Sequence, residues 1–107
     1  AMQLTVTTQK KTQFIDITSQ IQAIVTTQDI DRGLCFVFVP HTTAAVTINE
    51  NADPAVPSDM LNVLNTIIPW DLDYRHLEGN SAAHVKSTFV GVPAVIAIET
   101  VQLNLGT

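Results

Sequence analysis

The chain has only one cysteine, Cys35, and this excludes an internal disulfide. Positive charge is also scarce, because five lysines and arginines stand against ten acidic residues and give a net charge of -5. A general nucleic-acid binder neutralises phosphates with Lys and Arg, so this balance argues against that class. No apolar run approaches the roughly 20 residues that a membrane-spanning helix needs. Since no signal-peptide pattern is visible either, we expect a cytoplasmic protein.

What the chain has in quantity is aliphatic side chains. Hydrophobic residues make up 46% of its 107 positions, whereas aromatic residues make up only 6%. This is enough apolar material for one core, and neither an internal repeat nor an inter-domain linker divides the sequence. We therefore expect a single domain over residues 1–107, with β-branched and aliphatic residues filling a strand-rich interior.

Apolar patterns predict the strands. The run 34–39 is apolar at every position and ends at Pro40, which predicts a strand that is buried on both faces and central in the sheet. Shorter or alternating patterns predict further strands at 2–8, 13–17, 45–48, 94–98 and 101–105. A tight turn at Glu99 and Thr100 would join the last two.

Two segments have the apolar spacing of a helix. The first covers residues 17–25, with Asp16 or Thr18 available as its N-cap. The second begins at Asp53-Pro54 or near Pro57 and stops before Pro69. The polar stretch 70–81 that follows is expected to be an ordered loop.

The three histidines lie in two short polar segments, which we predict to form the functional site. Neutral imidazoles with a carboxylate nearby can bind a zinc-like ion, and His41, His76, His84 and Asp53 are the candidate ligands. The spacing of these histidines matches no closed structural zinc pattern. The alternative is that one or two of them only hydrogen-bond to the backbone.

Four oxygen-bearing side chains stand within five residues at Asn49, Glu50, Asn51 and Asp53. This density suits a hydrated magnesium ion or a substrate with hydroxyl groups. A turn followed by a helix N-cap would use Asn and Asp equally well, and this is the structural alternative for Asp53. Glu50 has no capping role there, so we predict it to be a candidate base.

The segment from Gly79 to Ser87 has groups that suit an anion such as phosphate. Gly79, Asn80 and Ser81 could present backbone N–H groups, and Ser87 and Lys86 could add a hydroxyl and an ammonium. The simpler alternative is that Lys86 is a solvated charge on the surface.

Four motifs occur in the order that is typical of one family: His41-Thr42-Thr43-Ala44, Asn49 to Pro54, His76-Leu77-Glu78-Gly79, and His84-Val85-Lys86-Ser87 followed by Gly91. On these residues the chain resembles the YjbQ family, also called uncharacterised protein family 0047. Leu105-Gly106-Thr107 resembles the start of the family's closing motif, so the family's final strand and tail are absent from this sequence. The resemblance implies an α+β fold, with a mixed or antiparallel curved sheet packed against two main helices.

The resemblance also implies a function. Family members are associated with a weak thiamine-phosphate synthase activity, which joins a pyrimidine diphosphate to a thiazole phosphate and releases pyrophosphate. They assemble as homotrimers with sites near the subunit contacts. The expected partners are thus a phosphorylated small molecule and further copies of the chain, and a divalent metal, Mg or Zn, is a possible cofactor.

On that basis we assign provisional roles to the residues of the motifs. Glu50, His84 and Lys86 are the candidate catalytic residues, with His84 and Lys86 meeting phosphate oxygens. The candidate substrate-binding residues are Thr42, Thr43, Asn49, Asn51, Glu78, Gly79, Asn80 and Ser87. The alternative hypothesis is a trimeric protein that binds a metal or small metabolite without significant turnover.

Overall fold

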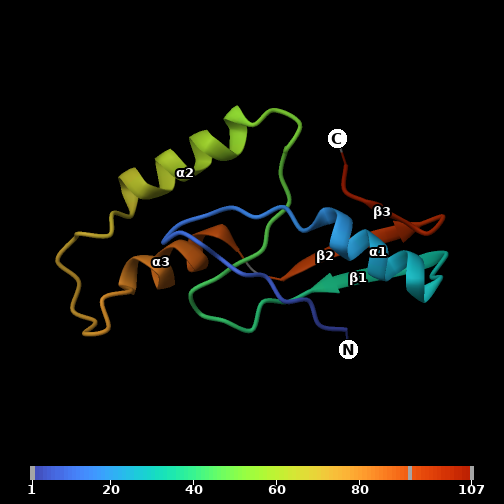
Figure 1. The fold of residues 1–107 in the computed structure, drawn as a ribbon, viewed down its shortest axis with the longest axis horizontal. Helices are drawn as coiled ribbons and strands as arrows, with labels where there is room; N and C mark the ends of the chain where they lie inside the picture. The colour runs from blue at the N-terminus through green and yellow to red at the C-terminus, as the bar shows by residue number, and fades with distance from the viewer. Residues whose placement is uncertain (1, 92, 107) are drawn as a thin grey trace.

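The structure is a computed structural model that describes residues 2–91 and 93–106. Helices and a small sheet occur together in it, as expected for an α+β fold (Figure 1). In chain order the elements are α1 (Thr18–Gln28), β1 (Arg32–Val37), α2 (Ala55–Ile67), α3 (Ser81–Val90), β2 (Ala94–Glu99) and β3 (Gln102–Asn104). The sheet and α1 lie at one end of the molecule, and α2 and α3 lie at the other.

The three strands that the structure describes form an antiparallel sheet in the order β1-β2-β3. Arg32 pairs with Glu99 and Val37 with Ala94, and on the other side of β2, Ile98 pairs with Leu103. The predicted strands 34–39, 94–98 and 101–105 are therefore confirmed with shifted ends. The prediction that 34–39 is central is wrong, because β2 is the strand with a neighbour on each side.

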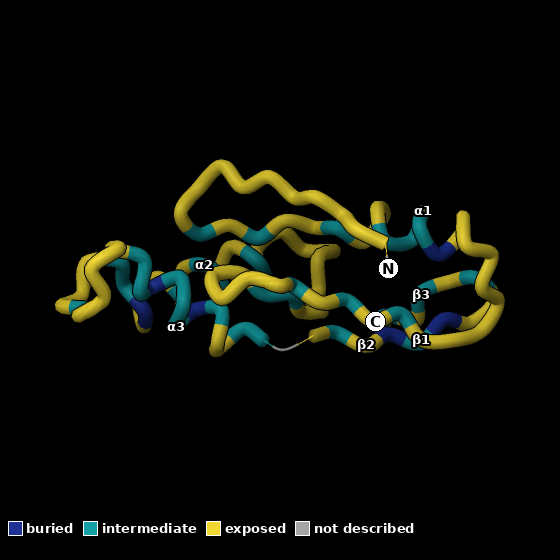
Figure 2. Tube along the Cα trace, turned by 90° about the horizontal axis from the view of Figure 1, so that it is seen from below, coloured by how far each residue is buried: buried dark blue, intermediate teal, exposed yellow. Residues whose placement is uncertain are grey.

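The two faces of the sheet differ in burial. Ile96 and Ile98 are buried on the face that α1 covers, where Val25 of α1 is also buried. Leu34 and Phe36 alternate onto the opposite face and are 73% and 66% exposed. The prediction that this strand is buried on both faces is thus wrong, since only one side of the described sheet carries a helix (Figure 2).

Local hydrogen bonds explain where α1 begins and ends. The Asp16 carboxylate accepts the backbone N–H of Thr18 at 2.9 Å and the Thr18 hydroxyl at 2.6 Å. At the other end Asp29 adopts a left-handed conformation (φ 53°), which Asp tolerates better than most residues. The predicted helix over 17–25 is confirmed and extends to Gln28.

The second predicted helix is also confirmed, as α2. The Asp53 carboxylate accepts the backbone N–H of Ala55 at 2.9 Å, and the helix ends at Ile67, two residues before Pro69. Pro57 lies in the first turn, where a backbone N–H would have no intrahelical partner.

Three predicted strands are wrong, because the structure has no strand at 2–8, 13–17 or 45–48. Residues 2–8 are exposed throughout (Figure 2). An alternating pattern becomes a strand only when a neighbouring strand accepts its backbone hydrogen bonds, and no such neighbour lies beside these segments in the part of the chain described.

The sequence prediction also missed α3 and counted two main helices where the described chain has three. The loop 70–81 is confirmed up to Asn80, where α3 begins. Ala82, Val85 and Phe89 have helical spacing within α3, and Gly91 follows its last residue. None of the described helices is long and apolar enough to cross a bilayer.

Candidate functional site

The N-terminal end of α3 brings two of the three histidines together. The rings of His76 and His84 meet edge to face, with their centroids 5.4 Å apart. The Glu78 carboxylate lies 3.7 Å from Nε2 of His76, which gives an ion pair when His76 is protonated. The structure therefore brings His76, Glu78 and His84 together.

The start of α3 is suited to an anion. The first N–H groups of a helix have no intrahelical acceptor, and the helix dipole places partial positive charge there. Gly79 adopts the left-handed conformation (φ 77°) that turns the chain into the helix. The amide Oδ1 of Asn80, the next residue, is buried without a hydrogen-bond partner. Gly79 and Asn80 are thus both placed beside the histidine pair.

Lys86 lies on another side of the same helix. Two residues along an α-helix correspond to a rotation of roughly 200°, so Lys86 and His84 point in different directions. Lys86 is only 6% exposed, and its ammonium donates to Thr12 Oγ1 at 2.8 Å and to Asn65 Oδ1 at 2.5 Å. Burial lowers the pKa of Lys86 below its ordinary value. Within one chain, Lys86 and His84 do not face the same point.

The segment 49–53 makes mostly local contacts in the described structure. The Asp53 carboxylate accepts the backbone N–H of Ala55 in the turn before α2, and Asn51 Nδ2 donates to Asp16 Oδ2 at 2.6 Å. Hydrogen bonds from the hydroxyl and backbone N–H of Thr18, together with this one from Asn51, lower the pKa of Asp16. Asn49 accepts the backbone N–H of Glu50 at 2.7 Å, while Glu50 is exposed. These contacts favour the turn that the sequence left open for Asp53, although the N-cap of α2 is Pro54.

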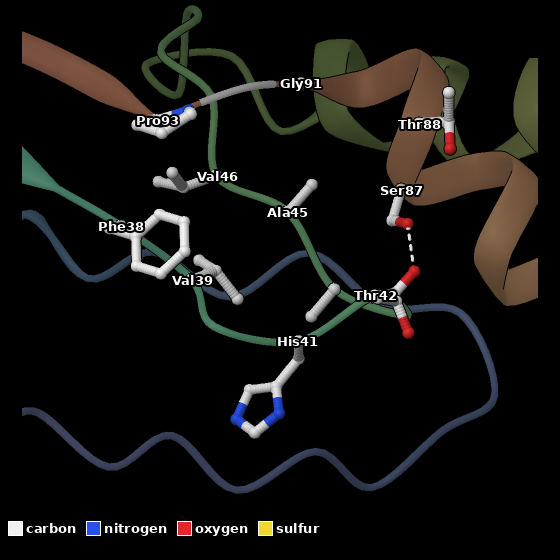
Figure 3. A pocket seen from close by; sticks show the side chains of 11 residues that line it. Phe38, Val39, His41, Thr42, Ala45, Val46, Ser87, Thr88, Gly91 and Pro93 are labelled. Atoms are coloured by element: carbon white, nitrogen blue, oxygen red, sulfur yellow. Dashed lines mark hydrogen bonds between the residues drawn. The ribbon is translucent and has the colours of Figure 1, made fainter.

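A cavity of about 240 Å³ lies between the chain that leaves β1 and the C-terminal half of α3 (Figure 3). Thr42 and Ser87 line it, and the Ser87 hydroxyl donates to the Thr42 carbonyl oxygen at 2.5 Å. The His41 backbone also borders the cavity, but its imidazole points away from Ser87 and Gly91. Thr43 is exposed and does not line this cavity.

The predicted metal ligands are not gathered in one chain. In residues 2–91 and 93–106, no three His, Cys, Asp or Glu side chains lie close enough together to hold a metal ion. His76 and His84 are paired, whereas His41 lies by the cavity and Asp53 lies in the turn before α2. A four-ligand site from His41, His76, His84 and Asp53 therefore stays a prediction that one described chain does not assemble.

Sequence reasoning missed the residues around Lys86. Thr12, Asn65 and Trp70 come from three separate segments, and Thr12 lies 74 positions before Lys86. The available signal was on α3 itself: Lys86 follows Ala82 by four residues, and Ala82 is buried. A lysine on the buried stripe of a helix needs polar partners, which the sequence pattern would have indicated had the helix been predicted.

Comparisons with known proteins agree with this fold. The family described as UPF0047 protein YjbQ-like matches residues 2–107. The UPF0047 protein YugU of Bacillus subtilis is 44% identical over 105 residues, which cover 97% of this chain and 80% of YugU. A UPF0047 protein of Methanocaldococcus jannaschii is also 44% identical, over 94% of this chain and 72% of its own length.

Solved structures of similar proteins have the same fold. A YjbQ/UPF0047 family protein of Clostridium acetobutylicum has a TM-score of 0.90 and 46% identity, covering 95% of this chain and 79% of that one. A hypothetical protein of Aeropyrum pernix has a TM-score of 0.88 and 33% identity, covering 95% and 77%. With the order of its motifs, its α+β fold and these relatives in agreement, the chain belongs to the UPF0047 family of YjbQ-like proteins.

Proposed function

We propose that the protein is a thiamine-phosphate synthase-like transferase, which joins a pyrimidine diphosphate to a thiazole phosphate and releases pyrophosphate. The observation that carries the proposal is the contact between His76 and His84 at the N-terminal end of α3. Two imidazoles beside a helix N-terminus form a donor set that suits phosphate oxygens. The choice of reaction rests on the family resemblance.

The proposed reaction requires a site that stabilises negative charge on the leaving group. Departure of pyrophosphate places that charge on the leaving oxygens, and oriented N–H donors lower the barrier most when they point at those oxygens. We assign the imidazole of His84 and the first backbone N–H groups of α3 to this task. Glu78 lies 3.7 Å from Nε2 of His76, beside this donor set.

The geometry supports a catalytic role less well for Lys86, Glu50 and a metal ion than for His84. Lys86 is held by Thr12 and Asn65, and no hydrogen bond or ion pair among the described residues links Glu50 to His84. A divalent ion, Mg or Zn, is proposed only for the homotrimer that the resemblance implies, where residues of neighbouring chains would complete its ligands. No step of the proposed reaction depends on that ion.

The test is formation of thiamine phosphate by protein purified from a host that lacks its own synthase, with and without added Mg²⁺ or Zn²⁺. Replacement of His84 by Ala should lower turnover by about 10² or more, the usual cost of losing one donor to a developing oxyanion. Gln20→Ala on the exposed side of α1 is the control, and it should leave turnover unchanged. Equal turnover in His84→Ala and wild type would overturn the proposal.

A second candidate function is binding of a small metabolite without turnover. The cavity of about 240 Å³ favours it, because Thr42, Ser87 and Thr88 place polar groups along a wall that is otherwise mostly apolar. The discriminating result would be tight binding of the substrates by calorimetry with no product formed. Product that is lost in Ser87→Ala but kept in His84→Ala would move the reaction to this cavity.

A further inference from the structure

Two lysines lie over the indole ring of Trp70. The ammonium of Lys86 is 5.2 Å from the ring centroid, and that of Lys11 is 5.4 Å from it. These residues come from α3, from the loop after α2 and from the N-terminal segment, which runs out to α3 and turns back before α1 (Figure 1). The fold thus gathers two of its five cationic residues, in an acidic chain, at one aromatic side chain.

Among the described residues, no carboxylate lies within 4 Å of either ammonium. Among the residues that the structure describes, the one ion pair within 4 Å joins His76 to Glu78, so neither lysine is paired with an acidic side chain. Lys86 is nevertheless buried, and its contacts are the neutral oxygens of Thr12 and Asn65. A buried ammonium without a counter-ion is unfavourable, and a bound anion would relieve that cost.

The hydrogen bonds around Thr12 leave several donors without an acceptor. Its hydroxyl oxygen accepts Trp70 Nε1 at 3.0 Å and Lys86 Nζ at 2.8 Å, so its own proton is left to donate. Lys86 has three N–H groups, of which Thr12 and Asn65 use two. The remaining donors come from Thr12, Lys86 and Lys11. Free donors on three neighbouring residues suit a ligand that accepts hydrogen bonds, which is the property of an oxyanion.

We propose that Lys11, Thr12 and Lys86, beside Trp70, form a binding site for a compact oxyanion of the phosphate type. This cluster lies on a different side of α3 from the pair of His76 and His84, so it goes beyond the reaction site proposed above. The ligand is a phosphate group that is free or part of a small molecule. Its affinity depends on both ammonium groups and on the Thr12 hydroxyl.

Trp70 is the only tryptophan of the chain, so its fluorescence reports directly on this cluster. The experiment titrates the full chain with inorganic phosphate, and with sodium chloride at matched ionic strength as the control. We expect a saturable change in emission with phosphate alone. Lys86→Met should abolish it. Lys11→Gln should raise the phosphate concentration at the midpoint by at least about tenfold, which corresponds to a loss of about 1.4 kcal/mol.

Matched variants decide the result. Lys10→Gln removes the neighbouring exposed lysine and should leave the midpoint unchanged. Thr12→Val tests the same cluster without removing a charge, and it should also weaken binding if Lys86→Met fails to fold. His84→Ala should keep the phosphate response. Three results would each overturn the proposal. The first is a wild-type response no larger than that with chloride, and the second is an equal midpoint in wild type, Lys11→Gln and Thr12→Val. The third is loss of the response in His84→Ala.

Discussion

The two ends of the molecule differ in what they bury. The sheet end, α1 with β1, β2 and β3, buries Val25, Ile96 and Ile98, all of which are apolar. The helical end, α2 and α3 with the loop between them, buries the apolar Ile68 and Ala82 and also a lysine, whose hydrogen bond to Thr12 joins separate segments (Figure 1). Apolar burial stabilises a fold, whereas an unpaired buried charge does not. We infer that apolar burial at both ends maintains the fold and that the helical end, with its buried charge, also carries the chemistry.

The largest effect should come from the buried face of the sheet. Ile98→Ala removes a side chain that is 3% exposed and should lower the free energy of unfolding by about 2–5 kcal/mol. Val95→Ala, in the same strand but 53% exposed, is the control and should cost far less. Denaturant unfolding measures both. Equal losses would show that the other face of the sheet is buried too, in an assembly of several chains.

A smaller loss is expected where α1 holds the β2–β3 turn. The Gln22 side chain donates to the carbonyl oxygen of Val101 at 2.8 Å and accepts the backbone N–H of Leu103 at 3.0 Å. Gln22→Ala should therefore lower the free energy of unfolding by about 1–2 kcal/mol, the sum of two typical hydrogen bonds. Gln20→Ala on the same helix should leave the melting temperature unchanged. If Gln22→Ala left the free energy of unfolding unchanged, the β2–β3 turn would not depend on these two hydrogen bonds.

A substitution in the β2–β3 turn should raise the stability of the fold. Thr100 and Val101 both adopt left-handed conformations, with φ of 52° and 61°, which β-branched residues disfavour. Asn is common in such hairpin turns, so Thr100→Asn should raise the free energy of unfolding by about 0.5–1 kcal/mol. Thermal unfolding of this variant beside wild type measures the gain, and a lower melting temperature would contradict it.

The smallest effect on stability is expected at the helical end. Lys86→Met replaces a buried charge by an apolar side chain of similar size, so the free energy of unfolding near neutral pH should change by less than about 1 kcal/mol. A loss of several kcal/mol would show that Lys86 has a counter-ion within the fold. The same substitution should abolish the phosphate response of Trp70, which separates stability from binding.

The pH dependence of stability sharpens this contrast. The pKa of Lys86 is lowered by burial below its ordinary 10.5, so over the interval up to that value the unfolded chain holds a proton that the folded chain has released. Lys86 should therefore make the free energy of unfolding rise with pH in that interval. Urea unfolding at several alkaline pH values should show a steeper rise for wild type than for Lys86→Met, and parallel curves would contradict this.

Local signals in the sequence predicted part of the fold. Asp16 and Asp53 at the starts of α1 and α2, and Pro69 after α2, act within a few residues of the positions they determine. The strands at 2–8 and 13–17 were predicted wrongly because alternation does not reveal whether a neighbouring strand is present. The prediction that 34–39 is the central strand was wrong for the same reason, because the pairing of β1 with β2 joins segments that are distant in the sequence.

The candidate site divides in the same way. The contact of His76 with His84 could be predicted because both lie in one short segment. The contacts of Lys86 with Thr12 and Asn65 could not, because three segments must fold before they meet. Whether Glu50 and His41 join the histidine pair in an assembly of several chains stays a prediction.

The most direct test of the central claim is calorimetric titration of pyrophosphate into Lys86→Met, which lacks the oxyanion site proposed beside Trp70, and into the same variant carrying His84→Ala or the control Gln20→Ala. If the N-terminal end of α3 binds the phosphorylated group, adding His84→Ala should weaken binding by at least about tenfold, the effect of losing about 1.4 kcal/mol. Neither added substitution should change the free energy of unfolding, and Gln20→Ala should leave the affinity unchanged. Equal affinities in all three proteins would contradict the account and remove the histidine pair from the site.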